Sequence, residues 1–165
     1  ALLGVRSSRP DAPRAVPGNE PLAGYETFVL RTLAKRQIAR EAAAGQRPLP
    51  EAAALFGQLN RLPPRLDPPE HSVLPGPTEG ERLCRQVVSY VGFPEPDWPP
   101  DAAGAGAARL TAELEVELAL RGTVRLPDPA GLPPATALVD RIRAGLTDAQ
   151  RRTLLPEPVG QFPPE

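Results

Sequence analysis

Proline limits what this chain can fold into more than any other residue type. There are 24 prolines among 165 residues, and they separate the large apolar side chains into short islands. Proline cannot continue the interior of a helix because it lacks the amide hydrogen and clashes with the preceding turn, and it also restrains the residue before it. Each island between prolines therefore predicts one short helix.

The composition lies between that of a disordered chain and that of a folded one. Pro and Gly are abundant, with 24 and 14 residues, which approaches the composition of disordered segments. Leu, Ile, Val and Phe together supply 39 residues, just enough for a core. We expect one domain with a small core, long irregular connections and loose ends.

Apolar residues recur at helical spacing in five of these islands. Helices this short are unstable alone in water and must pack against one another. The sequence thus predicts an all-α fold, an irregular bundle of about five short helices joined by Pro-rich loops. The expected helices cover residues 24–44, 50–62, 78–91, 105–121 and 135–144, with a short turn at 147–155.

The chain divides into three parts by composition. Residues 1–24 form a Pro/Arg-rich arm without apolar period, expected to be extended or disordered. Residues 25–155 hold the islands and form the small helical domain, and residues 156–165 form a loose Pro-rich tail.

Helix ends are marked by capping residues. Thr78 with Glu81 and Thr147 with Gln150 have the spacing of a capping box, in which the side chains of the first and fourth residue bond each other's backbone. Glycines at 45, 92, 122 and 145 are the expected stops.

The sequence also predicts the structure of the segments that connect the helices. We expect residues 63–77 to be a strap without regular structure, Trp98 to pack back on the helices, residues 101–106 to be a flexible lead-in, and residues 123–126 to form either a brief strand or a loop.

Basic residues form a row on the first expected helix. Arg31, Lys35, Arg36 and Arg40 lie off its apolar stripe, which is expected to contain Leu30, Leu33, Ala34, Ile38 and Ala42. Such a row is typical of a solvated face, here one that opposes the acidic middle of the chain, residues 48–122; a face that binds phosphates or an anionic surface is the alternative. The net charge of −1 argues against a nucleic-acid partner, which requires a concentrated positive field.

Four residues are the leading candidates for chemistry. Cys84, the only cysteine, lies on an apolar helix face, where a thiol usually behaves as a small buried hydrophobe. His71 lies between Glu70 and Ser72 but lacks a nucleophile-elbow motif, so we expect an exposed loop histidine. Glu113 and Glu117 are one turn apart and can bind a hard cation, although such pairs usually solvate a helix face. No residue is assigned a catalytic, cofactor-binding or metal-binding role.

One short motif resembles a known family. Residues 146–150 read Leu-Thr-Asp-Ala-Gln, which resembles the LTxxQ signature of small helical periplasmic stress proteins that act as ATP-independent chaperones or modulate sensor kinases. The match covers five residues and occurs once, whereas the family carries the motif twice on proline-poor helices. The same residues form an ordinary helix cap, and no family is assigned.

The sequence favours a non-enzymatic helical module that binds another protein through the first helix or the proline straps. The abundance of Ala, Gly, Pro and Arg, with 18 Arg against the single Lys35, indicates a GC-rich bacterial genome. The apolar start at Ala1 to Val5 raises the hypothesis of export or of a membrane tether before Ala1. The alternative is a small-ligand-binding protein or an enzyme whose site forms only in three dimensions.

Overall fold

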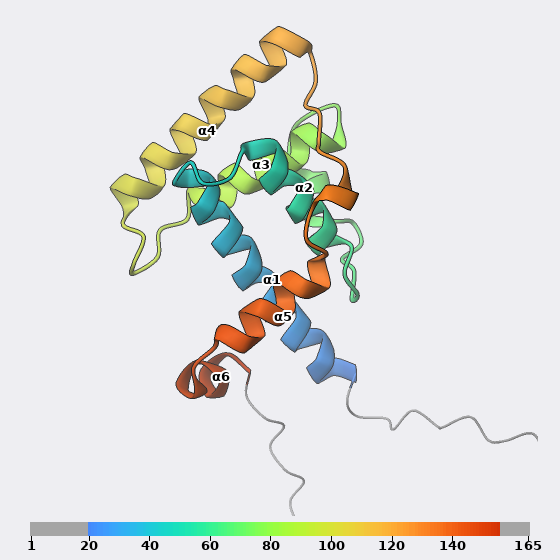
Figure 1. Cartoon of the computed structure of the whole chain (residues 1–165), viewed down its shortest axis with the longest axis vertical. Helices are drawn as coiled ribbons and strands as arrows, with labels where there is room; N and C mark the ends of the chain where they lie inside the picture. The colour runs from blue at the N-terminus through green and yellow to red at the C-terminus, as the bar shows by residue number, and fades with distance from the viewer. Residues whose placement is uncertain (1–19, 156–165) are drawn as a thin grey trace, which may run out of the picture.

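The computed structural model describes residues 20–155, with side chains from residue 24 onward. This part of the chain is all-α and contains six α-helices and two short 3-10 helices, as Figure 1 shows. The predicted fold class is confirmed; the expected arm and tail lie largely outside the described residues. The elements are α1 (Glu20–Ala43), α2 (Leu49–Asn60), η1 (Glu70–Val73), α3 (Glu79–Val91), α4 (Pro100–Arg121), η2 (Pro129–Gly131), α5 (Ala135–Gly145) and α6 (Asp148–Leu154).

The core lies where α1, α2 and α3 pack together. Along α2 the side chains of Leu55, Phe56 and Leu59 are completely buried, and Ala52 and Ala53 allow the neighbouring helices to approach closely. Because α2 is buried along much of its length, it forms the centre of the bundle. α5 covers α1 from another side, with Leu138 and Val139 buried, while α4 packs against α3 and α1.

A glycine sets how closely α4 approaches its neighbours. A Cβ atom at Gly106 would lie 3.1 Å from Val91 Cγ1 and 3.2 Å from Ala43 Cβ. Because α1, α3 and α4 meet at this point, only a residue without a side chain fits here without displacing α1 or α3.

Most predicted helix ends are confirmed. Thr147 and Gln150 form the complete capping box at α6, and Gly122 ends α4 with φ of 71°. At α3, Thr78 accepts from the Glu81 amide at 3.2 Å, but the Glu81 side chain binds Arg85 instead of reaching back. Only half of that capping box therefore forms.

Several boundaries differ from expectation. α1 begins at Glu20 rather than near residue 24, and α4 begins at Pro100, so the segment 101–106 expected to be flexible is helical. The strap between α2 and α3 contains η1, and residues 123–126 run without regular structure. None of the helices within residues 20–155 is both long and apolar enough to cross a bilayer.

Candidate functional site

A polar cluster lies in the core where a solvated face was expected. Arg31 and Lys35 were predicted to lie off the apolar stripe of α1, but they are 4% and 1% exposed. The reason is the whole connection between α2 and α3, residues 61–78, which includes the expected strap at 63–77 and covers this side of α1. Arg31 donates to the carbonyl oxygens of Leu62 at 2.8 Å and Pro64 at 2.9 Å. The prediction of a solvated row is wrong for these two residues.

Lys35 contacts both a carboxylate and two aromatic rings. Its Nζ lies 2.5 Å from Glu70 Oε2, 5.7 Å from the centre of the Phe56 ring and 5.5 Å from that of Tyr90. Burial lowers the pKa of Lys35, and the hydrogen bond with Glu70 opposes this effect. Burial also raises the pKa of Tyr90 to about 12.

His71 belongs to the same cluster rather than to an exposed loop. It is 8% exposed, and its Nδ1 lies 3.0 Å from the Asn60 amide nitrogen. Asn60 donates to Gln86 at 2.9 Å, and Gln86 donates to Glu70 at 2.7 Å. A chain of side chains thus connects His71 to Lys35, and burial lowers the pKa of His71.

The side chains of Glu70, His71 and Ser72 diverge. Glu70 binds Lys35, His71 contacts Asn60, and Ser72 Oγ donates to the carbonyl oxygen of Pro69 at 2.7 Å. The three adjacent residues therefore do not assemble a hydrolytic group.

One cavity brings Cys84, Glu113 and Glu117 together, but these side chains lack a reactive arrangement. Cys84 is completely buried, as predicted, and burial raises the pKa of its thiol to about 12. Glu113 pairs with Arg109, and Glu117 pairs with Arg121 at 3.3 Å. Among residues 20–155, no group of His, Cys, Asp or Glu has the geometry to hold a metal ion. The cavity, of about 300 Å³, is lined by Leu49, Pro50, Cys84, Glu113, Leu114, Glu117, Arg121, Val124 and Arg125.

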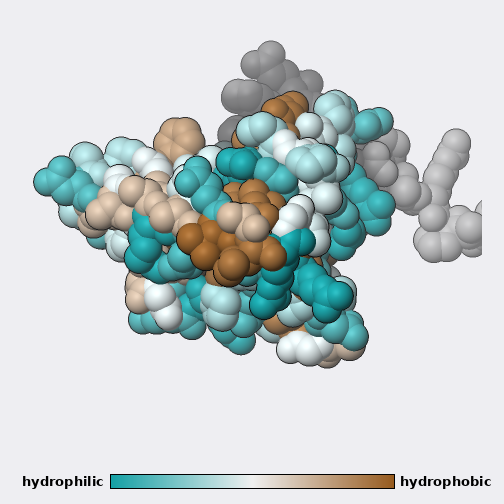
Figure 2. All heavy atoms as spheres, turned by 90° about the horizontal axis from the view of Figure 1, so that it is seen from above, coloured by the Kyte–Doolittle hydropathy of each residue, from teal (hydrophilic) through white to brown (hydrophobic). Residues whose placement is uncertain are grey.

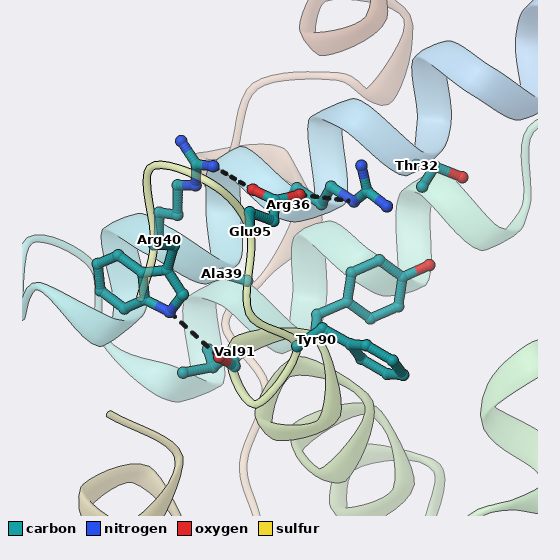
Figure 3. Close-up of a pocket in the computed structure, with 9 residues that line it drawn as sticks. Thr32, Arg36, Ala39, Arg40, Tyr90, Val91 and Glu95 are labelled. Atoms are coloured by element: carbon teal, nitrogen blue, oxygen red, sulfur yellow. Dashed lines mark hydrogen bonds and ion pairs between the residues drawn. The ribbon is translucent and has the colours of Figure 1, made fainter. Parts of the chain in front are cut away.

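The remaining two basic residues of the α1 row face an acidic loop, residues 92–99, which we call the Trp98 loop. Arg40 contacts both carboxylate oxygens of Asp97, at 2.7 and 2.8 Å, and also binds Glu95. Arg36 Nε lies 3.0 Å from the other oxygen of Glu95. Figure 3 shows Glu95 between the two arginines. The carboxylates therefore hold the Trp98 loop against α1.

The loop keeps its shape through a tight turn. The backbones of Glu95 and Trp98 exchange two hydrogen bonds of 2.9 Å, and the Trp98 indole donates to the Val91 carbonyl oxygen at 3.3 Å. Trp98 packs back on the helices, as predicted.

These contacts frame a pocket that combines aromatic rings with arginines (Figure 3), here called the α1 pocket. Its volume is about 250 Å³. Phe93 is 73% exposed at its edge, and the Arg36 side chain is 51% exposed. It is lined by Thr32, Arg36, Ala39 and Arg40 from α1, Tyr90 and Val91 from α3, and Phe93, Glu95 and Trp98 from the loop.

The α1 pocket adjoins a wider groove between α1, the Trp98 loop and the last two helices. This α1 groove has a volume of about 900 Å³ and shares Arg36, Arg40 and Glu95 with the pocket. Its far wall comes from α5 and α6. The other lining residues are Leu33, Gln37, Pro94, Pro96, Asp97, Arg141, Ile142, Gly145, Leu146, Gln150 and Leu154.

Sequence reasoning did not single out the aromatic half of this pocket. Three of the seven aromatic residues of the chain lie within residues 90–98. This clustering of aromatic residues is the sequence feature that could have indicated a binding pocket here. Pairing of Arg36 and Arg40 with the loop could not be predicted from helical spacing, because the partners lie more than fifty residues further along the chain.

No protein-family model matches this chain, and no curated protein or solved structure matches it significantly. The LTxxQ resemblance therefore has no support beyond its five residues, which form the cap of α6.

Proposed function

We propose that this chain is a non-enzymatic protein-interaction module that binds a partner through the α1 pocket and the α1 groove. The observation that carries the proposal is the combination of Tyr90, Phe93 and Trp98 with Arg36 and Arg40 in one partly open pocket. Tyr, Trp and Arg are the residues most enriched at the energetic centres of protein interfaces.

The chemistry of the pocket indicates the partner. Arg36 and Arg40 bind carboxylates of the chain's own Trp98 loop, and arginine recognises carboxylates through paired hydrogen bonds. The aromatic rings offer an apolar surface beside this charge. We therefore expect a partner segment that places an Asp or Glu next to an aromatic or aliphatic side chain.

Selection from a random peptide library displayed on phage tests this proposal with a defined probe. Peptides enriched on the wild-type chain should carry an acidic residue beside an apolar one. Phe93→Ser and Arg36→Glu should each weaken the binding of those peptides by about tenfold or more, since residues at the energetic centre of an interface contribute about 2 kcal/mol or more and about 1.4 kcal/mol is tenfold in affinity.

Matched substitutions elsewhere provide the control. Val73 is 79% exposed on η1, and Arg125 is exposed beyond α4, so Val73→Ser and Arg125→Glu should leave peptide binding unchanged. Peptides that bind all four variants equally would contradict the proposed site.

A small-ligand-binding protein is the second candidate, and the volume of the α1 pocket supports it. About 250 Å³ is close to the lower end of small-molecule sites, which are also lined by aromatic rings with a few polar groups. Saturation of the Trp98 fluorescence change by a small molecule, with no enrichment of peptides, would favour this candidate. An enzyme that uses Cys84 is disfavoured because a thiol with a pKa of about 12 supplies almost no thiolate at neutral pH.

The proposed membrane tether or export is a separate hypothesis. The gene sequence upstream of the codon for Ala1 tests it: a hydrophobic segment there would support the hypothesis, and a polar segment would contradict it.

A further inference from the structure

We propose that Glu95 and Asp97 of the Trp98 loop compete with the partner for the α1 pocket. Their carboxylates occupy Arg36 and Arg40 in the free chain, and a carboxylate of the partner has to take their place. This inference rests on the proposed function and adds the regulation of the same site. It starts from the chemical similarity between the Trp98 loop and the partner segment that the pocket fits.

The Trp98 loop has the composition expected of the partner. Residues 93–98 read Phe-Pro-Glu-Pro-Asp-Trp, so two acidic residues alternate with prolines between two aromatic residues. An acidic side chain beside an apolar one is the pattern that arginines next to aromatic rings favour. The loop therefore presents to α1 the same chemical groups as the expected partner segment.

The two arginines of the pocket are already paired within the chain. Arg40 contacts both carboxylate oxygens of Asp97, at 2.7 and 2.8 Å, which is the paired geometry by which arginine recognises a carboxylate. Glu95 lies between Arg36 and Arg40 and binds both (Figure 3). The charges of the two arginines and the two carboxylates cancel, so an approaching carboxylate gains little attraction until one of the internal carboxylates leaves.

The internal pairs can be exchanged because they lie at the surface. The Asp97 side chain is 69% exposed and that of Arg36 is 51% exposed, and ion pairs in contact with water contribute little to stability. The buried pair of Lys35 with Glu70, in which the lysine is 1% exposed, has no such freedom. Backbone hydrogen bonds between Glu95 and Trp98 close the turn. Either carboxylate can therefore leave its arginine without breaking the turn itself.

Competition of this kind lowers the affinity for the partner and improves selectivity. The apparent affinity falls in proportion to the fraction of the chain in which the arginines are available. A segment whose carboxylates are poorly placed does not offset the loss of the internal pairs, whereas a well-placed segment does. The Trp98 loop thus sets a threshold that a partner has to exceed.

Removal of the internal carboxylates tests the inference. The probe is a fluorescein-labelled peptide enriched on the wild-type chain, and its affinity is measured by fluorescence anisotropy. Asp97→Asn should bind the peptide about threefold more tightly, the gain expected from release of an exposed ion pair, and Glu95→Gln/Asp97→Asn should bind it more tightly still. Asp101→Asn is the matched control, because it removes the same charge from an exposed position in the first turn of α4. It should bind like the wild type.

A change in the peptide separates competition from a general effect of charge. Replacement of the acidic residue of the peptide by its amide should weaken binding more in Asp97→Asn than in the wild type. In the wild type, the acidic peptide displaces Asp97 from Arg40, whereas the amide peptide leaves this pair intact, and the difference between the two peptides is reduced accordingly. Equal losses in both chains would contradict competition.

Apolar surface outside the pocket is a separate source of peptide binding. Figure 2 shows a hydrophobic patch bordered by hydrophilic atoms on the face of the molecule seen there. Leu120 on α4 is 77% exposed and lines neither the α1 pocket nor the α1 groove. Leu120→Ser should leave all these affinities unchanged, and a loss of binding in this variant would place the peptide on α4 and overturn the inference.

The outcomes distinguish the inference from the proposed function. Unchanged or weaker binding by Asp97→Asn, with peptides that still require Phe93 and Arg36, would overturn the inference and leave the proposed function in place. If no peptide requires Phe93 and Arg36, the proposed function fails and the inference fails with it. Because Asp97 is largely exposed, Asp97→Asn should unfold at the wild-type temperature, and Glu95→Gln alone, expected to bind more tightly for the same reason, provides a second variant.

Discussion

Lys35 on α1 and Glu70 on η1 form an ion pair of 2.5 Å in which the two partners differ sharply in exposure. The lysine side chain is 1% exposed and the glutamate side chain is 29% exposed. Water can therefore hydrate the carboxylate when the pair is broken, but it cannot reach the ammonium group. This asymmetry determines which half of the pair the fold depends on.

We expect Glu70→Gln to destabilise the chain more than Lys35→Met. Removal of the carboxylate leaves a buried ammonium group without a counter-charge, which costs about 3 kcal/mol of unfolding free energy. Removal of the ammonium leaves a carboxylate that is partly hydrated and still accepts from Gln86, so the loss should be on the order of 1 kcal/mol. Urea denaturation followed by circular dichroism measures both values.

The double variant Lys35→Met/Glu70→Gln provides the control. It removes both charges and keeps the volume of the lysine stem, so it should be more stable than Glu70→Gln alone. Equal stability of the two would mean that the carboxylate acts through packing rather than through charge.

His71 should make the stability of the fold depend on pH. Burial lowers its pKa below the value of about 6.5 that it has in an unfolded chain; Glu79 opposes this effect, and Arg82, Arg61 and Lys35 add to it. Between these two pKa values the unfolded chain binds a proton that the folded chain does not. The unfolding free energy should therefore fall as the pH is lowered through about 6.5, and the loss should stop below the folded pKa.

Urea denaturation between pH 8 and pH 5 checks this expectation, with His71→Gln as the comparison. The variant should lose this part of the pH dependence. An unchanged pH profile in His71→Gln would assign the dependence to other groups.

The fold class could be predicted from the sequence because proline spacing and helix caps are local signals. Thr147 with Gln150, and Gly122 at the end of α4, act on residues within one turn. The start of α4 could not be predicted in this way. Gly104 and Gly106 suggested flexibility, but tertiary packing at Gly106 outweighs their low helix propensity.

The candidate site could be predicted much less well, because its residues depend on long-range contacts. Arg31 and Lys35 have the helical spacing of a solvated row. They are buried because the strap crosses them and, for Lys35, because Phe56 and Tyr90 also lie beside it. Cys84 was correctly expected to be buried, since a thiol on an apolar face needs no distant partner. His71 was expected to be exposed, because the residues next to it in the sequence do not indicate the contacts that connect it with Asn60 and Gln86.

Two glycines of α4 should respond in opposite ways to alanine. At Gly104 a Cβ atom would meet nothing within 4 Å, so Gly104→Ala should stabilise the fold by about 0.5–1 kcal/mol through helix propensity. Gly106→Ala forces a methyl group towards Val91 and Ala43 and should destabilise by about 1 kcal/mol in spite of that gain. Thermal unfolding measures both changes, and stabilisation by Gly106→Ala would show that α4 can move away from α1 and α3 with little loss of stability.

The Trp98 loop should depend more on Arg40 than on Arg36. Arg40 holds both oxygens of Asp97 and also binds Glu95, whereas Arg36 pairs with Glu95. Trp98 is the only tryptophan of the chain, so its fluorescence reports on this loop without background. Arg40→Gln should shift the emission to longer wavelength and increase quenching by acrylamide, because the indole gains contact with water. Arg36→Gln should have a smaller effect, and the exposed Arg152→Gln on α6 should have none. Equal effects of Arg36→Gln and Arg40→Gln would mean that Glu95, rather than Asp97, holds the loop in place.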